Sequence, residues 1–234
     1  MWQARFFKSL PAIEAEYPSA CWLFLTLTVR NCLIEELGQT LHEMNQAWRR
    51  LIMRKEFAPV LGWIRTTEVT RGKDGSAHPH FHALLMVPQS MLGRLYVKQE
   101  RWTEIWQEAA RLDYKPIVDI RSVRSKAPQG KEPQTINEKL RGVIAETLKY
   151  SVKPSDMVAD AEWFLEMTKQ IHKKRFIATG GALKNVLKLT EESDKDLITS
   201  DDVESEIIDD GKRIGFEWKT LSRRYKRSME LDRT

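Results

Sequence analysis

The chain has 234 residues, of which 41% are hydrophobic and 30% charged, so it is long enough to bury a core as one domain with additional elements. Its formal net charge is +5 at pH 7, and this basic excess suits a polyanionic partner. Its two cysteines are too few for a disulfide framework or a cysteine-based zinc module, and the lack of a long apolar stretch predicts a soluble, cytoplasmic protein with no membrane partner.

Apolar periodicity predicts alternating strands and helices over the first half of the chain. Runs of β-branched and aromatic residues predict strands, and apolar residues at three-to-four spacing predict amphipathic helices. The strands are expected at residues 22–30, 63–70, 79–87 and 116–124, and the helices at residues 34–54 and 98–112. Residues 71–76 have the composition of a turn, so the second and third strands should form an antiparallel hairpin.

The order of these elements, β-α-β-β-α-β, indicates the fold class. It is the split βαβ arrangement of ferredoxin-like and RRM-like domains, in which two helices pack on one face of an antiparallel sheet. We therefore expect an α+β fold with an antiparallel sheet of about five strands, whose first and third strands are central. A helix expected at residues 136–152 is available to cover the other face.

The remainder of the chain is predicted to contain further helices and a charged C-terminal region. Helices are expected at residues 160–174 and 181–189. Residues 191–210 hold ten acidic residues and one lysine, a net charge of −9, so the rest of the chain carries +14. We expect residues 1–190 to form the folded domain, residues 191–211 an acidic, disordered linker and residues 212–234 a basic tail.

Three of the five histidines lie within five residues of the third predicted strand. Side chains alternate along a strand, so His78, His80 and His82 should share one face. A single histidine in a strand is more often an ordinary hydrogen-bonded residue than a metal ligand. Three in register favour a divalent metal site, in which two imidazoles are held by one rigid strand.

A third, hard ligand is available on the neighbouring strand. The predicted hairpin would bring Glu68 close to His80, although Glu68 could equally be an ordinary surface acid. One carboxylate and two imidazoles with open positions suit Mn²⁺ or Mg²⁺ acting on a phosphate oxygen as a Lewis acid. His78, nearer the turn, is a further candidate ligand or a residue that supports the ligands.

A second set of candidate residues lies near the end of the helix predicted at 136–152. Glu146 and Tyr150 are four residues apart and should project from one helix face, with Lys149 and Lys153 beside the tyrosine. A phenol is a useful nucleophile when cations stabilise its phenolate, but a tyrosine beside a lysine is also commonplace. Candidate phosphate contacts are Lys149, Lys153, Arg65 and Arg124.

Three motifs, in this order along the chain, resemble those of the HUH endonuclease superfamily. Leu25-Thr26-Leu27-Thr28 resembles the first-strand motif of plasmid rolling-circle replication initiators, and His80-Phe81-His82 resembles the histidine–hydrophobe–histidine motif. The segment from Glu146 to Lys153 is similar to the tyrosine motif of the subgroup with a single tyrosine and a glutamate four residues before it. The likeness extends over about residues 20–190 and is strongest to initiators of cyanobacterial plasmids.

The resemblance implies an activity and a role for each matched residue. Residues 1–190 would be an endonuclease domain, in which Tyr150 attacks a phosphodiester of single-stranded or hairpin origin DNA to form a 5′-phosphotyrosine. His80, His82 and Glu68 would hold the Mn²⁺ or Mg²⁺ ion, and Glu146 would activate water in the terminating cleavage. No Walker motif occurs, so unwinding and synthesis would need a host helicase and polymerase. A cysteine-rich segment found in related initiators is absent, and a dimer is left open.

Two other interpretations remain. A relaxase or transposase of the same superfamily would share the chemistry and act on a different DNA substrate. A non-catalytic RRM-like module would also combine this fold with a basic surface, but it would expose aromatic side chains on the sheet for base stacking. The discriminating feature is whether histidines and a glutamate, or aromatic rings, occupy the open sheet face.

Overall fold

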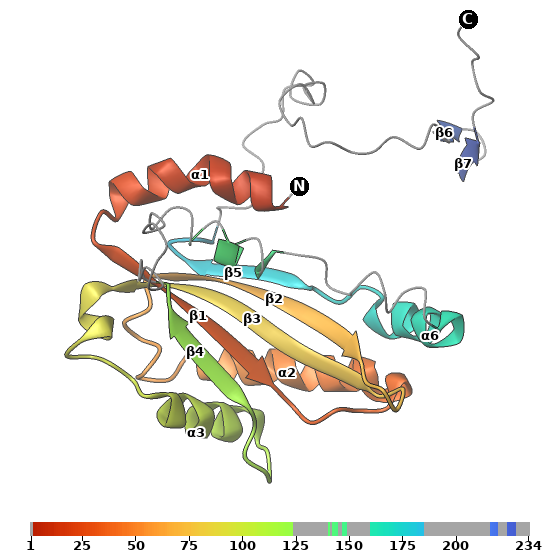
Figure 1. Ribbon diagram of the computed structural model, residues 1–234, viewed down its shortest axis with the longest axis horizontal. Coiled ribbons are helices and arrows are strands. Elements are labelled where there is room, and N and C mark those ends of the chain that lie inside the picture. The colour runs from red at the N-terminus through yellow and green to blue at the C-terminus, as the bar shows by residue number, and fades with distance from the viewer. Residues whose placement is uncertain are drawn as a thin grey trace, which may run out of the picture. The chain divides into compact units, whose positions relative to one another are not determined.

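A five-stranded antiparallel sheet forms the framework of residues 1–189 in the computed structural model (Figure 1). The strand order β4-β1-β3-β2-β5 makes the first and third strands central, as predicted. The strands are β1 (Ala20–Thr28), β2 (Gly62–Arg71), β3 (Ala77–Pro88), β4 (Val118–Ser122) and β5 (Ile177–Gly181). Helices lie on both faces of this sheet, which confirms the α+β fold.

The structure describes residues 2–123, 140, 142–144, 147–148 and 160–184, and the backbone of residues 216–219 and 224–227. The chain divides into two units, residues 1–189 and 190–234. In the second unit, β6 (Phe216–Lys219) pairs antiparallel with β7 (Arg224–Arg227). Among the residues described, no helix is long and apolar enough to cross a membrane.

The hairpin of β2 and β3 sets the register of the sheet. It pairs Glu68 on β2 with His80 on β3, as the sequence predicted. On the other side of β3, Thr26 of β1 lies opposite His82. Because side chains directly opposite each other in an antiparallel pair point to the same face, all four residues share one face in the middle of the sheet.

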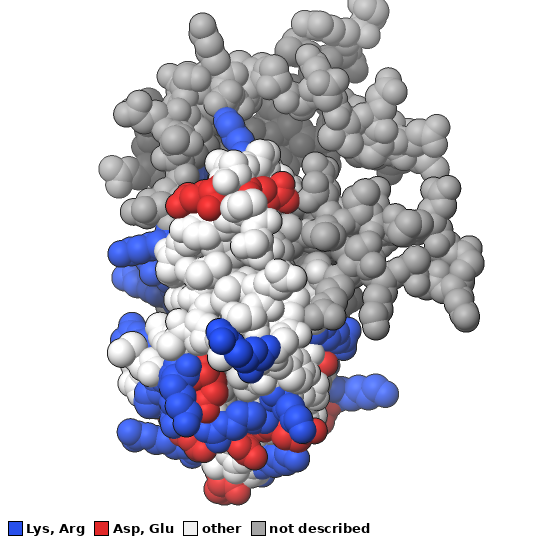
Figure 2. Space-filling model, turned by 90° about the vertical axis from the view of Figure 1, so that its left-hand side faces the viewer, with Lys and Arg blue, Asp and Glu red and all other residues white. Residues whose placement is uncertain are grey.

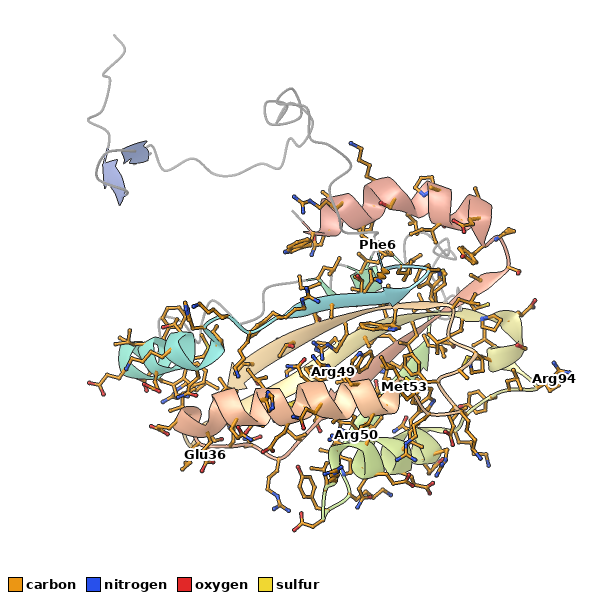
Figure 3. All side chains as sticks on the ribbon, turned by 180° about the vertical axis from the view of Figure 1, so that it is seen from behind. Phe6, Glu36, Arg49, Arg50, Met53 and Arg94 are labelled. Atoms are coloured by element: carbon orange, nitrogen blue, oxygen red, sulfur yellow. The ribbon has the colours of Figure 1, made fainter. Side chains whose placement is uncertain are left out.

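Helices from three parts of the chain cover the opposite face. They are η1 (Ile34–Glu36) and α2 (Leu37–Leu51), α3 (Gln99–Ala110), and α6 (Ala161–Ile171), with the short η2 (Gln89–Leu92) after β3. Their apolar sides bury Trp48, Trp102 and Trp106 against Leu25 and Phe81 of the sheet. Figure 3 shows α2 and α3 together below the sheet, so this layer holds the larger hydrophobic core.

The histidine-bearing face is partly covered by α1 (Trp2–Glu16), a helix that the sequence analysis did not predict. Figure 3 shows Phe6 pointing from α1 toward the sheet, where it is fully buried. Phe6 packs edge-on against Trp22, with ring centroids 6.1 Å apart. The buried residues of this smaller core are Phe6, Leu10, Trp22, Ile64, Leu84, Met86, Leu140, Ile144, Leu148 and Leu183.

One predicted element is wrong where the structure describes it. Residues 181–189 were expected to be a helix, but β5 extends to Gly181 and residues 182–184 form a turn. The strand forms because the Ile177–Gly181 backbone completes the hydrogen bonding of β2 at the edge of the sheet. The predicted strands, and the helices predicted at residues 34–54, 98–112 and 160–174, agree with the structure to within a few residues at each end. Residues 185–189 lie outside the described part, and α1, η2, β6 and β7 were not predicted.

Candidate metal centre

Three buried side chains converge at the middle of the sheet. Potential ligand atoms of Glu68, His80 and His82 all lie within 4.8 Å of one another, and the residues are 4%, 9% and 7% exposed. Oε2 of Glu68 lies 3.1 Å from Nε2 of His82 and 3.3 Å from Nε2 of His80. The sequence-predicted trio is therefore brought together, with both Nε2 atoms directed at the same carboxylate oxygen.

A contact of Nδ1 with the backbone shows which ring nitrogen of His80 donates a hydrogen bond. Nδ1 of His80 lies 3.3 Å from the backbone carbonyl oxygen of His78, and a carbonyl can only accept a hydrogen bond. Nδ1 therefore carries a proton, and the other ring nitrogen, Nε2, faces Oε2 of Glu68. A lone pair on Nε2 and the carboxylate oxygen could together hold a cation between them.

The donor set fits a divalent ion. Neutral imidazole nitrogens and one carboxylate oxygen are ligands that Mn²⁺ accepts readily, and Mg²⁺ accepts the carboxylate with water or phosphate oxygens at the remaining positions. Burial of all three residues lowers the local dielectric, which strengthens the attraction between a cation and Glu68. The trio thus meets the chemical requirements of the metal site predicted from the sequence.

His78 lies beside this group rather than within it. Its ring centroid is 5.2 Å from that of His80, and its Nδ1 donates to Oδ1 of Asn31 across 2.6 Å. Burial lowers the pKa of His78, and the neighbouring His80 lowers it further, so the ring stays neutral near pH 7. His78 is therefore a neutral side chain at the rim of the candidate site.

The burial of Arg65 contradicts the expectation that it contacts phosphate. Arg65 is 2% exposed and lies on the helix-covered face, with its guanidinium 4.0 Å from the ring centroid of Phe81 and 5.6 Å from that of Trp48. Strand alternation explains this, because an odd-numbered residue of β2 points away from the face that carries Glu68. The remaining predicted site residues lie outside the described part of the chain: Arg124, Glu146, Lys149, Tyr150 and Lys153.

One described residue within the tyrosine motif and one that follows it contact this part of the sheet. Leu148 is 7% exposed and packs in the core that contains Leu84 and Met86, on the same face of β3 as His82. Asp160 pairs with Arg71 at the far end of the hairpin, where its Oδ2 lies 2.8 Å from Nη2 of the arginine. The candidate site on β3 lies between these two attachment points along the strand.

Two residues that the sequence analysis did not assign also contact His82. Oγ1 of Thr26 lies 3.1 Å from Nδ1 of His82, and the ring of Phe24 stacks on the imidazole at a centroid distance of 5.3 Å. Alternation along β1 places Thr26 and Phe24 on one face, but the contact also depends on the β1–β3 register. That register pairs segments more than fifty residues apart, and no sequence pattern specifies it.

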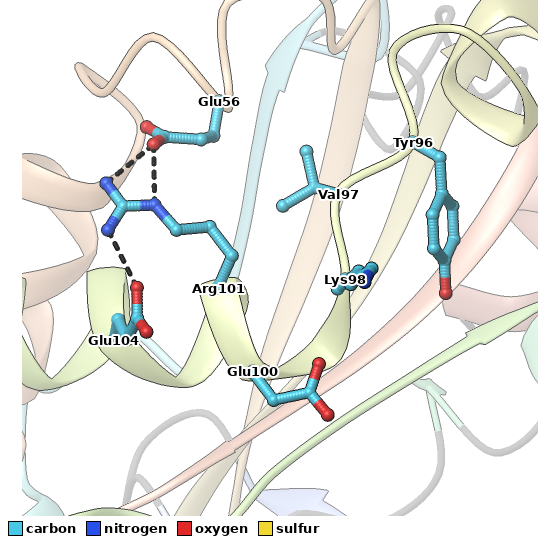
Figure 4. A pocket seen from close by; sticks show the side chains of 7 residues that line it. All are labelled: Glu56, Tyr96, Val97, Lys98, Glu100, Arg101 and Glu104. Atoms are coloured by element: carbon cyan, nitrogen blue, oxygen red, sulfur yellow. Dashed lines mark hydrogen bonds and ion pairs between the residues drawn. The ribbon is translucent and has the colours of Figure 1, made fainter.

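A pocket on the helical side is lined by Glu56 in the segment after α2, by residues 96–98 and by the first turns of α3 (Figure 4). One of its lining residues, Arg101, donates hydrogen bonds to Glu56 across 2.7 Å and to Glu104 across 2.9 Å. On the side drawn in Figure 2, basic and acidic residues are intermixed at the lower end, where α3 lies in Figure 1. Because these charges neutralise one another locally, this region is a poor surface for a polyanion.

Comparison with known proteins identifies related sequences. A family model described as Replication protein matches residues 1–226. A replication protein of Staphylococcus aureus is 34% identical over 231 residues, which cover 93% of this chain and 95% of the relative. Protein rep of Streptococcus pneumoniae serotype 2 is 34% identical over 220 residues, covering 90% of this chain and 65% of the relative. No solved structure matches the chain significantly.

Proposed function

This chain belongs to the replication protein family whose model it matches, and from that membership we propose that it initiates rolling-circle replication of a plasmid as a metal-dependent DNA nickase. Its substrate would be single-stranded or hairpin DNA at the replication origin. The observation that carries the proposal is the convergence of Glu68, His80 and His82 on one buried point of the sheet.

The proposed reaction transfers a phosphodiester to the protein. Glu68, His80 and His82 would hold a divalent ion, Mn²⁺ or Mg²⁺, whose chemistry is to polarise a non-bridging oxygen of the scissile phosphate. The phenol oxygen of Tyr150 attacks phosphorus and loses its proton, and the bond from phosphorus to the 3′ oxygen breaks. That oxygen takes up a proton, which leaves a 3′-OH primer for a host polymerase and a 5′-phosphotyrosine.

Charged residues of the same motif have roles in this scheme. Lys149 and Lys153 stabilise the phenolate and the attacked phosphate. Glu146 takes a proton from water in the terminating cleavage, so that this strand is hydrolysed without a second covalent adduct. A host helicase separates the strands ahead of synthesis.

The contacts of the described chain support a site shared by the tyrosine motif and the histidine strand. Leu148, two residues before Tyr150 in the sequence, packs on the same sheet face as His82. Asp160, ten residues after Tyr150, is bound to Arg71 at the other end of the hairpin. Along β3, the candidate metal residues lie between these two contacts.

The structure gives less support to a non-catalytic RRM-like module. Such a module stacks bases on exposed sheet aromatics, whereas Trp22 and Phe24 on this face are 5% and 8% exposed. A relaxase or transposase would use the same residues, but the related proteins are named as replication proteins, which favours replication.

The test uses overlapping single-stranded oligonucleotides tiled across the DNA that flanks the coding sequence, each labelled at the 5′ or the 3′ end. With Mn²⁺, we expect the 3′ label to migrate with the protein on a denaturing gel and the 5′ label to appear on a shorter free fragment. Tyr150→Phe should abolish the adduct and retain DNA binding, while Tyr96→Phe, at a 60% exposed tyrosine, should behave as wild type. An adduct formed by Tyr150→Phe would refute the assignment of the nucleophile.

A further inference from the structure

Thr26 is the side chain that holds the second nitrogen of His82. It lies directly opposite His82 in the pairing of β1 with β3, and its Oγ1 is 3.1 Å from Nδ1. The other ring nitrogen, Nε2, lies 3.1 Å from Oε2 of Glu68. The ring is therefore held at both nitrogens, by a hydroxyl on one side and by the candidate metal group on the other.

The stacking of Phe24 on His82 constrains the ring plane but does not select between its two orientations. The two rings lie 13° from parallel, so the contact resists tilting of the imidazole. Rotation by 180° about the Cβ–Cγ bond keeps that plane and exchanges the positions of nitrogen and carbon atoms. Only a polar partner distinguishes the two states, and the Thr26 hydroxyl hydrogen-bonds to nitrogen in the orientation that directs Nε2 at Glu68.

His80 achieves the same orientation by a different contact. Its Nδ1 donates to the backbone carbonyl oxygen of His78, which no substitution at His78 removes. The orientation of His82 depends instead on a side chain 56 residues away in the sequence. This difference makes Thr26 the position at which the ligand geometry can be altered while the three candidate ligands remain present.

Building on the proposed metal site, we propose that Thr26 is a positioning residue that fixes His82 as an Nε2 ligand. In the metal-bound state, Nδ1 carries the proton and donates a hydrogen bond to Oγ1 of Thr26. The lone pair of Nε2 is then available to the ion. This assigns a structural cause to the threonine at the second position of the Leu25–Thr28 motif.

The experiment measures Mn²⁺ affinity of the full chain by titration calorimetry, in the absence of DNA. Loss of such an outer partner typically weakens metal binding about 10- to 100-fold, and we expect a loss in this range for Thr26→Val. Thr26→Ser restores the hydroxyl and should bind within about 3-fold of wild type. Thr28→Val is the matched control, because Thr28 lies on the same strand and face but donates to the carbonyl oxygen of Ile117.

A spectroscopic readout separates positioning from general destabilisation. In ¹⁵N spectra of the protein loaded with Zn²⁺, a diamagnetic ion that accepts imidazole nitrogen, His82 should be a single tautomer protonated at Nδ1 in wild type and a mixture in Thr26→Val. If Thr26→Val does not fold, the pair Thr26→Ser and Thr26→Ala, which differ by the hydroxyl oxygen, provides the same comparison.

The outcomes distinguish this inference from the metal site on which it rests. Wild-type affinity in Thr26→Val, or equal losses in Thr26→Val and Thr26→Ser, would overturn the positioning role and leave the site intact. Failure of the wild-type protein and of Thr28→Val to bind Mn²⁺ would overturn the metal site and the positioning role together.

Discussion

Nη2 of Arg71 donates a 2.8 Å hydrogen bond to Oδ2 of Asp160, which joins the hairpin to the start of α6 across 89 positions of sequence. The other carboxylate oxygen, Oδ1, accepts from the backbone N–H of Trp163 and caps the helix. The indole N–H of Trp163 in turn donates to the backbone carbonyl oxygen of Gly75 in the hairpin turn. These contacts hold the start of α6 against the end of β2 and the turn of the β2–β3 hairpin.

This arrangement predicts a pH-dependent contribution of Asp160 to stability. Its hydrogen bond from the Trp163 N–H, followed by the contact with Arg71, holds the pKa of Asp160 below its usual value. A carboxyl group whose pKa is depressed by folding stabilises the native state above its unfolded pKa of about 3.9, and that contribution is lost as pH falls through the folded pKa. Asp160→Ala should therefore lower the melting temperature at pH 7, and the difference from wild type should shrink as the pH falls below about 3.9.

Calorimetric melting curves at pH 7, 5 and 2.5 test this prediction. Asp113→Ala is the control and should leave the melting temperature unchanged at each pH. Asp113 is exposed, and no hydrogen bond or ion pair joins it to another described residue. A deficit in Asp160→Ala that persists undiminished at pH 2.5 would show that the carboxylate charge is not the cause.

The metal-site trio was predictable because two local rules fix it. The turn at residues 71–76 sets the hairpin register, and the two-residue period of a strand then puts Glu68, His80 and His82 on one face. The same period could have corrected Arg65, since a residue three positions before Glu68 must point to the opposite, helix-covered face. Strand alternation therefore indicates a buried Arg65, although its charge suggested a contact with phosphate.

Other features depend on contacts between distant parts of the chain. Arg5, Lys8 and Pro11 interrupt the apolar pattern of α1, yet Phe6 and Leu10 of this helix are buried. They pack with the sheet and with three distant residues, Leu140, Ile144 and Leu148. The Ile177–Gly181 strand ends in glycines, where Gly180 packs closely against the indole of Trp63 and Gly181 has a φ of +58°. The sequence predicted a helix beginning at residue 181, but edge pairing with β2 extends β5 to Gly181.

Arg65 supports a prediction about stability. Burial, with smaller effects of Arg175 and Arg49, lowers the pKa of Arg65 to about 10. This lowered pKa means that folding destabilises the charged guanidinium by about 3 kcal/mol. The cation–π contacts with Phe81 and Trp48 offset about 2 kcal/mol of that cost. Within the described residues, Nε has no hydrogen-bond partner. Arg65→Met, which keeps the packing and removes the charge, should therefore raise the free energy of unfolding by about 1 kcal/mol.

Urea unfolding at pH 7 measures this change. Arg65→Ala should lower the free energy of unfolding by about 2 kcal/mol, because it removes the same charge but leaves a cavity beside Phe81. Arg121→Met, at an exposed arginine paired with Asp119, should change it by less than about 0.5 kcal/mol. A loss of stability in Arg65→Met comparable to that of Arg65→Ala would mean that the guanidinium itself stabilises the fold.

Removal of a metal ligand should abolish both ion binding and divalent-dependent cleavage. His80→Ala and His82→Ala each delete one of three donors, and Glu68→Gln removes the negative charge that attracts the ion. We expect each change to lower Mn²⁺ affinity by at least about 100-fold. Mn²⁺ at 100 times its dissociation constant should stabilise the wild-type protein by about 2.7 kcal/mol, an effect that these variants should lose. His78→Ala should retain most of both properties, because His78 lies outside the trio. Equal cleavage by any trio variant in chelator would argue against the site.

Glu146 provides the last prediction, which concerns the terminating cleavage of the proposed reaction. If its carboxylate takes a proton from the attacking water, Glu146→Ala and Glu146→Gln should still form the Tyr150 adduct. Both variants should then hydrolyse a second origin strand about 10²- to 10⁴-fold more slowly than wild type. The measurement begins with the isolated adduct, adds a labelled second oligonucleotide, and follows hydrolysed product separately from strand transfer. Glu43→Ala, at an exposed glutamate of α2, is the control. Because nucleophile and base act in different steps, a defect in adduct formation would assign Glu146 to the first step, and unchanged hydrolysis would assign the base to another residue.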